Sequence, residues 1–426
     1  MLKIIIFDFI TITIGCIFLI YTIVQLVKGK YNTIYIAYVG FYIFFIFPII
    51  LDLIVGYPNY YYIKNFNFEG FILSQRDNLT RLYYNIFIII ILILFMVFGK
   101  SKPITINKTE ILKLKKFLKI PLTVVLVIIT LIPTLLVLNF NFSLGVGFNK
   151  LLNYDYLRLL FRSSPDFLLY YYCCLFSVLS FIGLTFIYPK KIWILTLFLC
   201  IPIYISFGVH GKRNIVAIFI FLYVFVIWLN KYISKKVKIS IIILAIPIFL
   251  MFTFYYQSSV RSIEGSSFNE FYTDFRIDYG RDDVVKMAIY YDLYDEDIIN
   301  ESGISLLYLM KFIGFDDLRT EYKYSVYATS ALLGYHTAVP LGWGMTTGLW
   351  DESIANFGIL FGTFIFIVII ILMCRISDYT NNIPIILLTY INVILIQVLQ
   401  LTSFIFIFAI WILLLVLHFF KKLRLD

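Results

Sequence analysis

The side chains best suited to chemistry in this sequence are cationic groups beside long apolar runs. One set, His210, Lys212 and Arg213, lies in FGVHGKRN, where one apolar run ends and the next begins. A second set, Arg276 and Arg281, lies in DFRIDYGRDDVVK. A helix N-terminus offers free N–H groups and the positive end of the helix dipole, and arginine adds bidentate contacts to phosphate oxygens. Both sets therefore predict a binding site for a phosphate-containing anion.

Arg158 and Arg162 add two cations from another polar stretch. Long cationic side chains also occur where they reach lipid phosphates at a membrane surface. A charged segment such as 276–286 equally suits a solvated helix with internal salt bridges. These alternatives stay open beside the anion site, and the sequence does not decide whether Arg276 or Arg281 contacts the anion.

His336, in ALLGYHTAVPLGWG, is one of only three histidines in the chain. An imidazole titrates near neutral pH, which suits a general base that takes a proton from a hydroxyl group. A lone histidine is also common as a structural residue. His210 and the carboxylate of Glu352 are competing candidates for the base, and Glu352 is a candidate substrate-binding residue.

The elements that must position these residues are membrane helices. Of 426 residues, 62% are hydrophobic and 14% are charged, whereas a soluble domain carries about 25% charged residues. Apolar runs of about the length that crosses a bilayer recur along the chain. We predict an all-α polytopic membrane protein with about 11 (10 to 12) transmembrane helices. The predicted helices cover residues 2–27, 33–56, 81–98, 118–140, 167–187, 190–207, 214–229, 237–256, 353–374, 382–399 and 401–420.

The distribution of lysine and arginine predicts the orientation of these helices. One alternate set of loops, with the C-terminal tail, carries 19 of the 35 basic residues and few acids. The other short loops carry nine, and a long loop is not counted by the positive-inside rule. The first set is therefore expected in the cytoplasm. The N-terminus and the long polar segment are expected on the outer face.

The long polar segment, residues 257–352, separates eight predicted helices in 1–256 from three in 353–426. Apolar residues recur within it at helical spacing, which predicts amphipathic helices over the membrane domain. These residues are Phe268, Phe271, Phe275, Val284, Val285, Ala288 and Ile289. A further apolar run, Ile304–Phe315, is too short to cross a bilayer and suits a helix lying at the membrane surface.

Several function classes lack their sequence motifs. The chain contains no Walker loop, no HExxH, no GxSxG and no kinase motif set. The five cysteines lie in or beside apolar runs, which disfavours disulfides and a zinc site. We expect no cofactor and no metal. The net charge of +10 is explained by membrane topology, so no nucleic-acid partner is expected.

The order of these features resembles the bacterial O-antigen and oligosaccharide repeat-unit polymerases (Wzy-like), which are related to O-antigen ligases. The resemblance rests on many short-loop spans, one large outer loop near the C-terminal third, and three local motifs. These are GKRN at a helix start, FRIDYGRDDVVKMAIY, and H-x₃-P followed by G-x-x-x-x-E-S-x-x-N-F-G.

The resemblance implies a GT-C-like membrane glycosyltransferase of O-antigen and lipopolysaccharide synthesis on the outer face of the bacterial inner membrane. It would transfer a glycan from undecaprenyl pyrophosphate to a lipid-linked repeat unit, with inversion and without a metal, and a chain-length regulator is an implied partner. By position, Arg213 and Arg281 (or Arg276) would hold the pyrophosphate, and His336 would activate the acceptor hydroxyl. A ligase or a lipid-linked oligosaccharide flippase are the alternatives.

Overall fold

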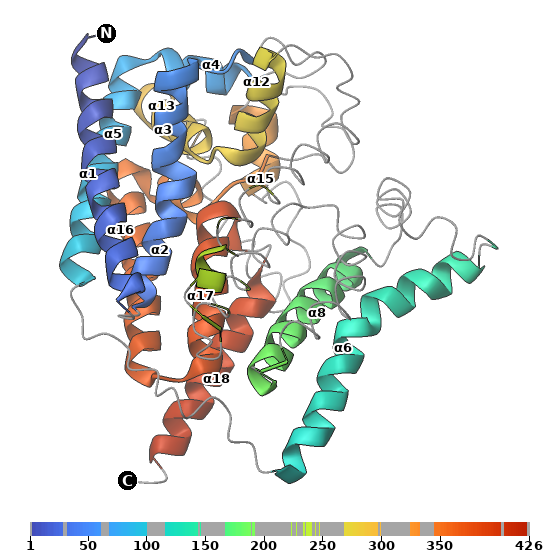
Figure 1. The fold of residues 1–426 in the computed structure, drawn as a ribbon. Helices are drawn as coiled ribbons and strands as arrows, with labels where there is room; N and C mark the ends of the chain where they lie inside the picture. The colour runs from blue at the N-terminus through green and yellow to red at the C-terminus, as the bar shows by residue number, and fades with distance from the viewer. Residues whose placement is uncertain are drawn as a thin grey trace. The chain divides into compact units, whose positions relative to one another are not determined.

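The computed structural model of the chain (Figure 1) is helical throughout the regular elements that it describes. The described residues are 2–28, 32–60, 68–99, 116–143, 145, 167–188, 190–191, 223, 227, 233–234, 236–240, 243, 247, 268–296, 299, 324–332, 345–401 and 404–423. Five of the described helices are long and apolar enough to cross a membrane. The chain is therefore a helical protein of the kind that is embedded in membranes.

Most predicted helices within the described residues are confirmed. The helices α1 (Leu2–Val27), α5 (Asn78–Phe98), α6 (Lys116–Ser143), α8 (Phe167–Ile187), α17 (Ile383–Val398) and α18 (Ile405–Leu423) match predicted spans. The predicted helices at 190–207, 214–229 and 237–256 fall almost entirely outside the described residues, as does the run Ile304–Phe315. The count of about 11 spans and the GT-C-like fold remain predictions.

Backbone contacts divide the chain into two compact units. Unit 1 comprises Met1–Thr105 and Ser266–Asp426, and unit 2 comprises Ile106–Gly265. In unit 2, α6 packs along α8, and the hydroxyl of Ser177 donates to the backbone oxygen of Thr130 at 2.8 Å. All of the described part of the long polar segment belongs to unit 1, together with the first three predicted spans.

The core of unit 1 is built around Trp350, which is fully buried. Its ring stacks on Phe366 at 5.4 Å between centroids and lies 5.2 Å from Phe45. Tyr84 of α5 and Phe41 of α2 (Thr33–Phe41) complete the aromatic cluster. Large aromatic rings bury much apolar surface, so this cluster joins the second and third predicted spans to the C-terminal helices.

The second predicted span, 33–56, is not a regular helix. It consists of α2, a π-helical turn η1 (Tyr42–Ile46) and α3 (Phe47–Val55). Pro48 lacks an N–H group and cannot donate to the carbonyl of Phe44, four residues earlier. The backbone N–H of Arg281 donates to that Phe44 oxygen at 3.3 Å, and the Tyr84 hydroxyl donates to the Phe45 oxygen at 2.8 Å. Neighbouring elements thus satisfy carbonyl groups at the irregular turn.

Helix α16 (Leu349–Thr380) is bent at Gly358, whereas the sequence predicts one regular helix over 353–374. Gly358 has a φ of 75°, a conformation that favours glycine. The Trp350 indole N–H donates to the Thr363 hydroxyl at 2.9 Å, although 13 residues of straight helix would separate them by about 20 Å. The prediction of a regular helix is wrong here, because the chain folds back at Gly358.

The bend has its own cap from α13 (Asp282–Tyr294). The backbone N–H of Ile359, the first residue after Gly358, donates to Asp292 Oδ2 at 3.1 Å. We expect Asp292→Ala to destabilise the protein by about 1 kcal/mol, because a helix start loses its side-chain acceptor. Asp292→Asn keeps an acceptor oxygen and serves as the control. Equal melting temperatures in detergent for Asp292→Ala and the wild type would show that the cap contributes nothing.

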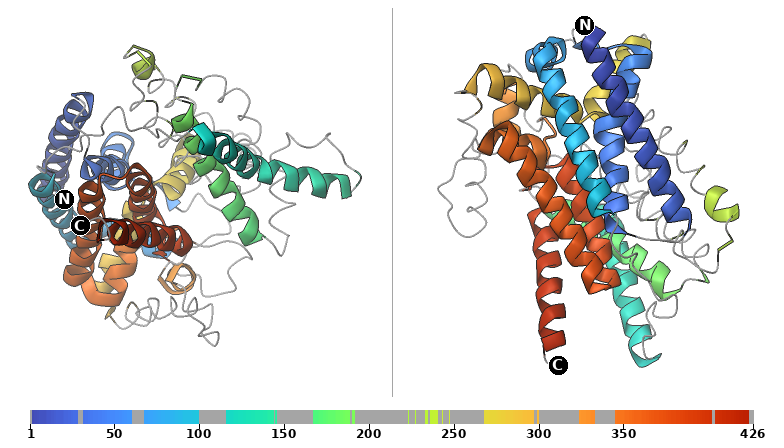
Figure 2. Two further views of the ribbon diagram at one scale, coloured as in Figure 1. Left: turned by 90° about the horizontal axis from the view of Figure 1, so that it is seen from below. Right: turned by 90° about the vertical axis from the view of Figure 1, so that its left-hand side faces the viewer.

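The ends of unit 1 group the loops as the charge pattern predicts. At one end, Asn32 donates to the backbone oxygen of Gly99 at 3.2 Å, and the Thr33 hydroxyl donates to Asp378 Oδ1 at 2.5 Å. Helices α12 (Phe268–Tyr279) and α13 of the long segment lie at the opposite end, where α1 begins (Figures 1 and 2). The start of α2 therefore lies beside the ends of α5 and α16.

Candidate functional site

The polar end of unit 1 is defined here as the place where four groups of residues meet. These are the end of α3, helix α4 (Glu69–Arg76), the pair α12 (Phe268–Tyr279) and α13, and the start of α16. Helices α4, α12 and α13 lie at this end in Figure 1. The helices α12 and α13 form where the apolar spacing predicts helices, and residues 282–289 of α13 are all buried. The alternative of a solvated helix is therefore wrong for α13.

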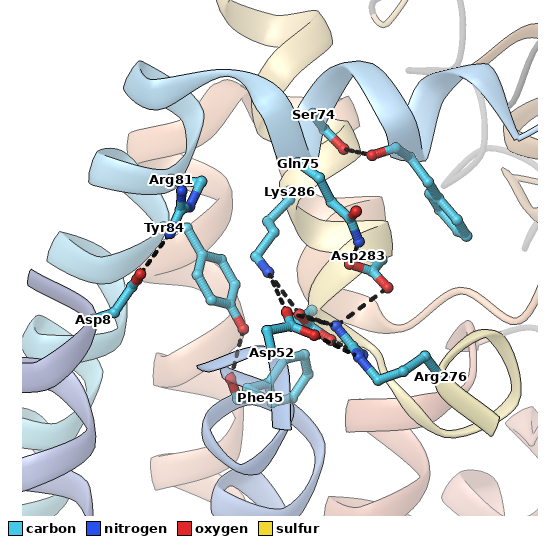
Figure 3. Close-up of polar contacts among 12 residues, drawn as sticks. Asp8, Phe45, Asp52, Ser74, Gln75, Arg81, Tyr84, Arg276, Asp283 and Lys286 are labelled. Atoms are coloured by element: carbon cyan, nitrogen blue, oxygen red, sulfur yellow. Dashed lines mark hydrogen bonds and ion pairs between the residues drawn. The ribbon is translucent and has the colours of Figure 1, made fainter. Parts of the chain in front are cut away.

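A group of buried charges, termed the charged cluster, lies at this end (Figure 3). It consists of Asp52, Arg276, Asp282, Asp283 and Lys286. The fully buried Arg276 guanidinium donates to both oxygens of Asp52 at 3.0 Å and to both oxygens of Asp282 at 2.9 and 3.0 Å. Such bidentate, charge-assisted contacts are the strong kind. Arg276 therefore ties α12 to the end of α3 and to the start of α13.

The remaining members of the charged cluster complete its pairing. Lys286 Nζ donates to Asp282 Oδ2 at 2.7 Å and lies 5.1 Å from the centre of the Tyr84 ring. Asp283 accepts from Gln75 Nε2 at 2.9 Å and from the hydroxyl of Tyr60. Buried charges are costly unless they are paired and hydrogen-bonded, and here carboxylates and cations alternate through one network.

The surroundings keep Asp282, Lys286 and Arg276 ionised. Burial raises the pKa of Asp282, but the charges of Arg276 and Lys286 outweigh it and bring that pKa to about 2, below the ordinary 3.8. Burial lowers the pKa of Lys286, yet the carboxylates of Asp282 and Asp283 raise it above its usual value. The same balance raises the pKa of Arg276. Asp282 and both cations therefore stay charged at neutral pH.

The lowered pKa of Asp282 makes part of the stability pH-dependent. A carboxyl group with a depressed pKa in the folded state stabilises fully above its unfolded value, here near 3.8, and loses that contribution as the pH falls toward about 2. We expect Asp282→Asn to be less stable than the wild type at pH 7, and the difference to shrink between pH 4 and 2. Melting temperatures of both proteins across this range measure it.

The exposed carboxylate of Glu296 provides the control for that titration. Glu296→Gln removes a charge from the end of the same region without touching the charged cluster, so its difference from the wild type stays small at every pH. A constant difference for Asp282→Asn from pH 7 to pH 2 would contradict the ion pairing described here.

The break between α12 and α13 places Gly280 against Arg276. A Cβ atom at residue 280 would lie 2.0 Å from Arg276 Nη1 and 2.8 Å from Asp282 Oδ1. Glycine is therefore required for close packing with the guanidinium group. The motif RIDYGRDD contains the arginine, the glycine and the aspartate of this contact. The sequence alone does not show that Arg276 and Asp282, six residues apart, form an ion pair.

Arg281 occupies the N-cap of α13, and its side chain is also buried. Its Nη1 donates to the backbone oxygen of Gly280 at 3.3 Å. Its charge interacts with Asp351, a buried residue in the first turn of α16. Arg281 thus interacts electrostatically with a carboxylate of α16, whereas Arg276 is held by Asp52 and Asp282.

A second group of buried polar residues surrounds the start of α16. Asp351 Oδ1 accepts from the backbone N–H of Gly348 at 2.8 Å and caps the helix. Glu352 follows it and is also buried. Tyr324, in α15 (Tyr324–Tyr327), interacts electrostatically with Asp351 and Glu352. We call Tyr324, Thr347, Asp351 and Glu352 the α16 polar group.

Three of the eight residues proposed from the sequence are described by the structure. Arg276, Arg281 and Glu352 all lie at the polar end of unit 1. The other five candidates, His336, Arg213, Lys212, His210 and Arg158, lie outside the described residues.

Sequence reasoning missed the partners that α3 and α5 provide. Asp52, near the end of an apolar run, pairs with Arg276, and Asp8 accepts from Arg81 at 2.5 Å and from Asn85 at 2.7 Å. Charged residues within membrane segments generally pair with one another. That rule indicates that Asp8 and Asp52 need cations, but it does not say which ones.

The class that the fold defines is a helical membrane protein with a buried ionic network at one end. Comparisons of the chain with protein-family models, curated proteins and solved structures find no match.

Proposed function

We propose that the chain is a polymerase of lipid-linked oligosaccharide repeat units in surface polysaccharide synthesis. It would transfer a glycan from undecaprenyl pyrophosphate to the non-reducing-end hydroxyl of an acceptor repeat unit, on the outer face of a bacterial inner membrane. The proposal extends the sequence resemblance described above. The observation that favours it is the buried guanidinium of Arg281 at the N-cap of α13, at the end of unit 1 expected to face outward.

The chemistry needs a fixed cation and an acceptor for a proton. Breaking a glycosyl–phosphate bond leaves negative charge on the departing diphosphate, and a pre-positioned guanidinium group stabilises that charge in the transition state. We assign this role to Arg281, with Arg213 and Lys212 as further phosphate-binding residues. Arg276 is already engaged by Asp52 and Asp282, so its proposed role is to position the start of α13 and hence Arg281.

His336 remains the proposed base for the acceptor hydroxyl, with Arg158, His210 and Glu352 as proposed substrate-binding residues. The hydroxyl oxygen forms the new bond to the anomeric carbon as the bond to the diphosphate oxygen breaks. The electron pair leaves with the diphosphate, and the hydroxyl proton passes to the base. In this scheme the configuration of the anomeric carbon of the transferred glycan is inverted.

The test is a reconstitution of the purified protein in vesicles with a lipid-linked repeat unit as its sole substrate. A ladder of glycans that differ by one repeat unit is expected. Transfer only after a different acceptor is added would indicate a ligase. Movement of the lipid-linked unit between leaflets with no new glycan bond would indicate a flippase, and either result would overturn the polymerase proposal.

A further inference from the structure

Three side chains of the α16 polar group carry buried polar atoms without a hydrogen-bond partner. They are the hydroxyl oxygens of Tyr324 and Thr347 and the Oδ2 atom of Asp351. The three residues are only 1%, 1% and 2% exposed. A buried polar atom left without a partner costs about 1–3 kcal/mol, and such atoms are rare in folded proteins. Their concentration around one helix start calls for a functional reason.

The local backbone brings these side chains together. The N–H of Met345 donates to the Thr329 hydroxyl at 2.8 Å, and that hydroxyl donates to the backbone oxygen of Ser325 at 2.6 Å. The chain leading into α16 is thereby fixed to the segment that begins with Tyr324. Thr347 directly precedes the glycine whose N–H is bound by Asp351 Oδ1, which leaves Oδ2 of Asp351 without a donor.

The Tyr324 hydroxyl is suited to donate to a ligand. Burial, followed by the charges of Asp351 and Glu352, raises its pKa well above the usual value, so the hydroxyl keeps its proton. The group as a whole offers two hydroxyls, which donate and accept, and a carboxylate oxygen, which accepts. A ligand that satisfies these atoms must both donate and accept hydrogen bonds.

We propose that Tyr324, Thr347 and Asp351 form a binding site for the hydroxyl groups of a sugar. Neighbouring hydroxyls on a sugar ring donate and accept together, as this set requires. The described residues contain no group of three or more potential metal-ligating His, Cys, Asp or Glu side chains. The site rests on the proposed function for the identity of its ligand, a repeat-unit glycan. Its member Asp351 interacts with the charge of Arg281.

The test compares two tyrosine-to-phenylalanine variants that differ in hydrogen bonding. Tyr324→Phe removes a hydroxyl that has no protein partner, so we expect unchanged or higher thermal stability together with a KM for the lipid-linked repeat unit raised about tenfold, the effect of one lost hydrogen bond. Tyr84→Phe removes a hydroxyl bound to the Phe45 oxygen, so we expect lower stability and an unchanged KM. An unchanged KM for Tyr324→Phe would overturn the sugar site.

Asp351→Asn gives a second variant that keeps the helix cap. Its amide oxygen still accepts from the Gly348 N–H, while the carboxylate oxygen is replaced by a donor. We expect the same rise in KM with little loss of stability. A large loss of stability with an unchanged KM would mean that Asp351 serves the helix alone.

Ligand-induced stabilisation separates this inference from the proposed function. A ligand that binds the folded protein raises its melting temperature. If the wild type makes no polymer, yet the lipid-linked repeat unit stabilises it and stabilises Tyr324→Phe less, the polymerase proposal fails and the sugar site stands. If the wild type polymerises and Tyr324→Phe is indistinguishable from it, the sugar site alone fails. The same measurement with free repeat-unit glycan, without the lipid diphosphate, shows whether the glycan alone raises the melting temperature.

Discussion

Replacing Arg276 with methionine is expected to destabilise the protein by about 3–5 kcal/mol, the usual cost of removing one partner from a buried ion pair. The reason is that Asp52, Asp282 and Asp283 all lie around one fully buried guanidinium group. Without Arg276, the single charge of Lys286 remains to compensate three carboxylates. Since domains are stable by about 5–15 kcal/mol, the variant would retain a small margin or unfold.

The measurement is thermal unfolding in detergent, supported by the amount of protein recovered from membranes. Arg76→Met is the matched control, because Arg76 is exposed on α4 and stands outside the charged cluster; its effect is expected within about 0.5 kcal/mol. If Arg276→Met and Arg76→Met have the same melting temperature, the charged cluster does not hold α12 and α13 in place.

Replacing Arg281 with alanine is expected to slow glycan transfer by about 10²–10³-fold, the range seen when one donor to a developing negative charge is removed. Arg281 lies outside the Arg276 ion pairs, and its charge interacts with that of Asp351. Loss of this guanidinium removes a cation from the proposed diphosphate site while the charged cluster keeps its pairs. The rate of glycan transfer should therefore fall strongly, whereas the melting temperature should change little.

Arg281→Lys distinguishes charge from geometry. Lysine keeps a positive charge but lacks the planar fork that contacts two phosphate oxygens, so an intermediate rate is expected. Arg76→Ala removes an exposed cation and should transfer glycan at the wild-type rate. Full activity of Arg281→Ala, with its folding verified by thermal unfolding, would exclude Arg281 from the reaction.

The fold was predictable to the extent that it depends on hydrophobic spacing. Long apolar runs specify α1, α5 and α8 almost to the residue, and the phenylalanines of the polar segment specify α12. The irregular turns were not predictable, because they depend on partners distant in sequence. The Phe44 carbonyl is satisfied by the N–H of Arg281, and the bend at Gly358 is capped by Asp292.

The candidate site was predictable by residue type but not by pairing. The sequence shows Arg276 and Arg281 as equivalent cations five residues apart. Only the fold separates them, because Asp52 lies 224 residues from Arg276 along the chain and reaches it through the end of α3. The α16 polar group shows the same limit: Tyr324 and Asp351 are unremarkable in sequence until the backbone brings them together.

The most direct test of the central claim follows the bond that the proposed reaction breaks. Purified protein is incubated with a labelled lipid-linked repeat unit, and free undecaprenyl pyrophosphate is quantified together with glycan length. The account predicts that the amount of pyrophosphate released equals the number of repeat-unit bonds formed. Glycan growth without that release, or no glycan growth by folded protein, would contradict it.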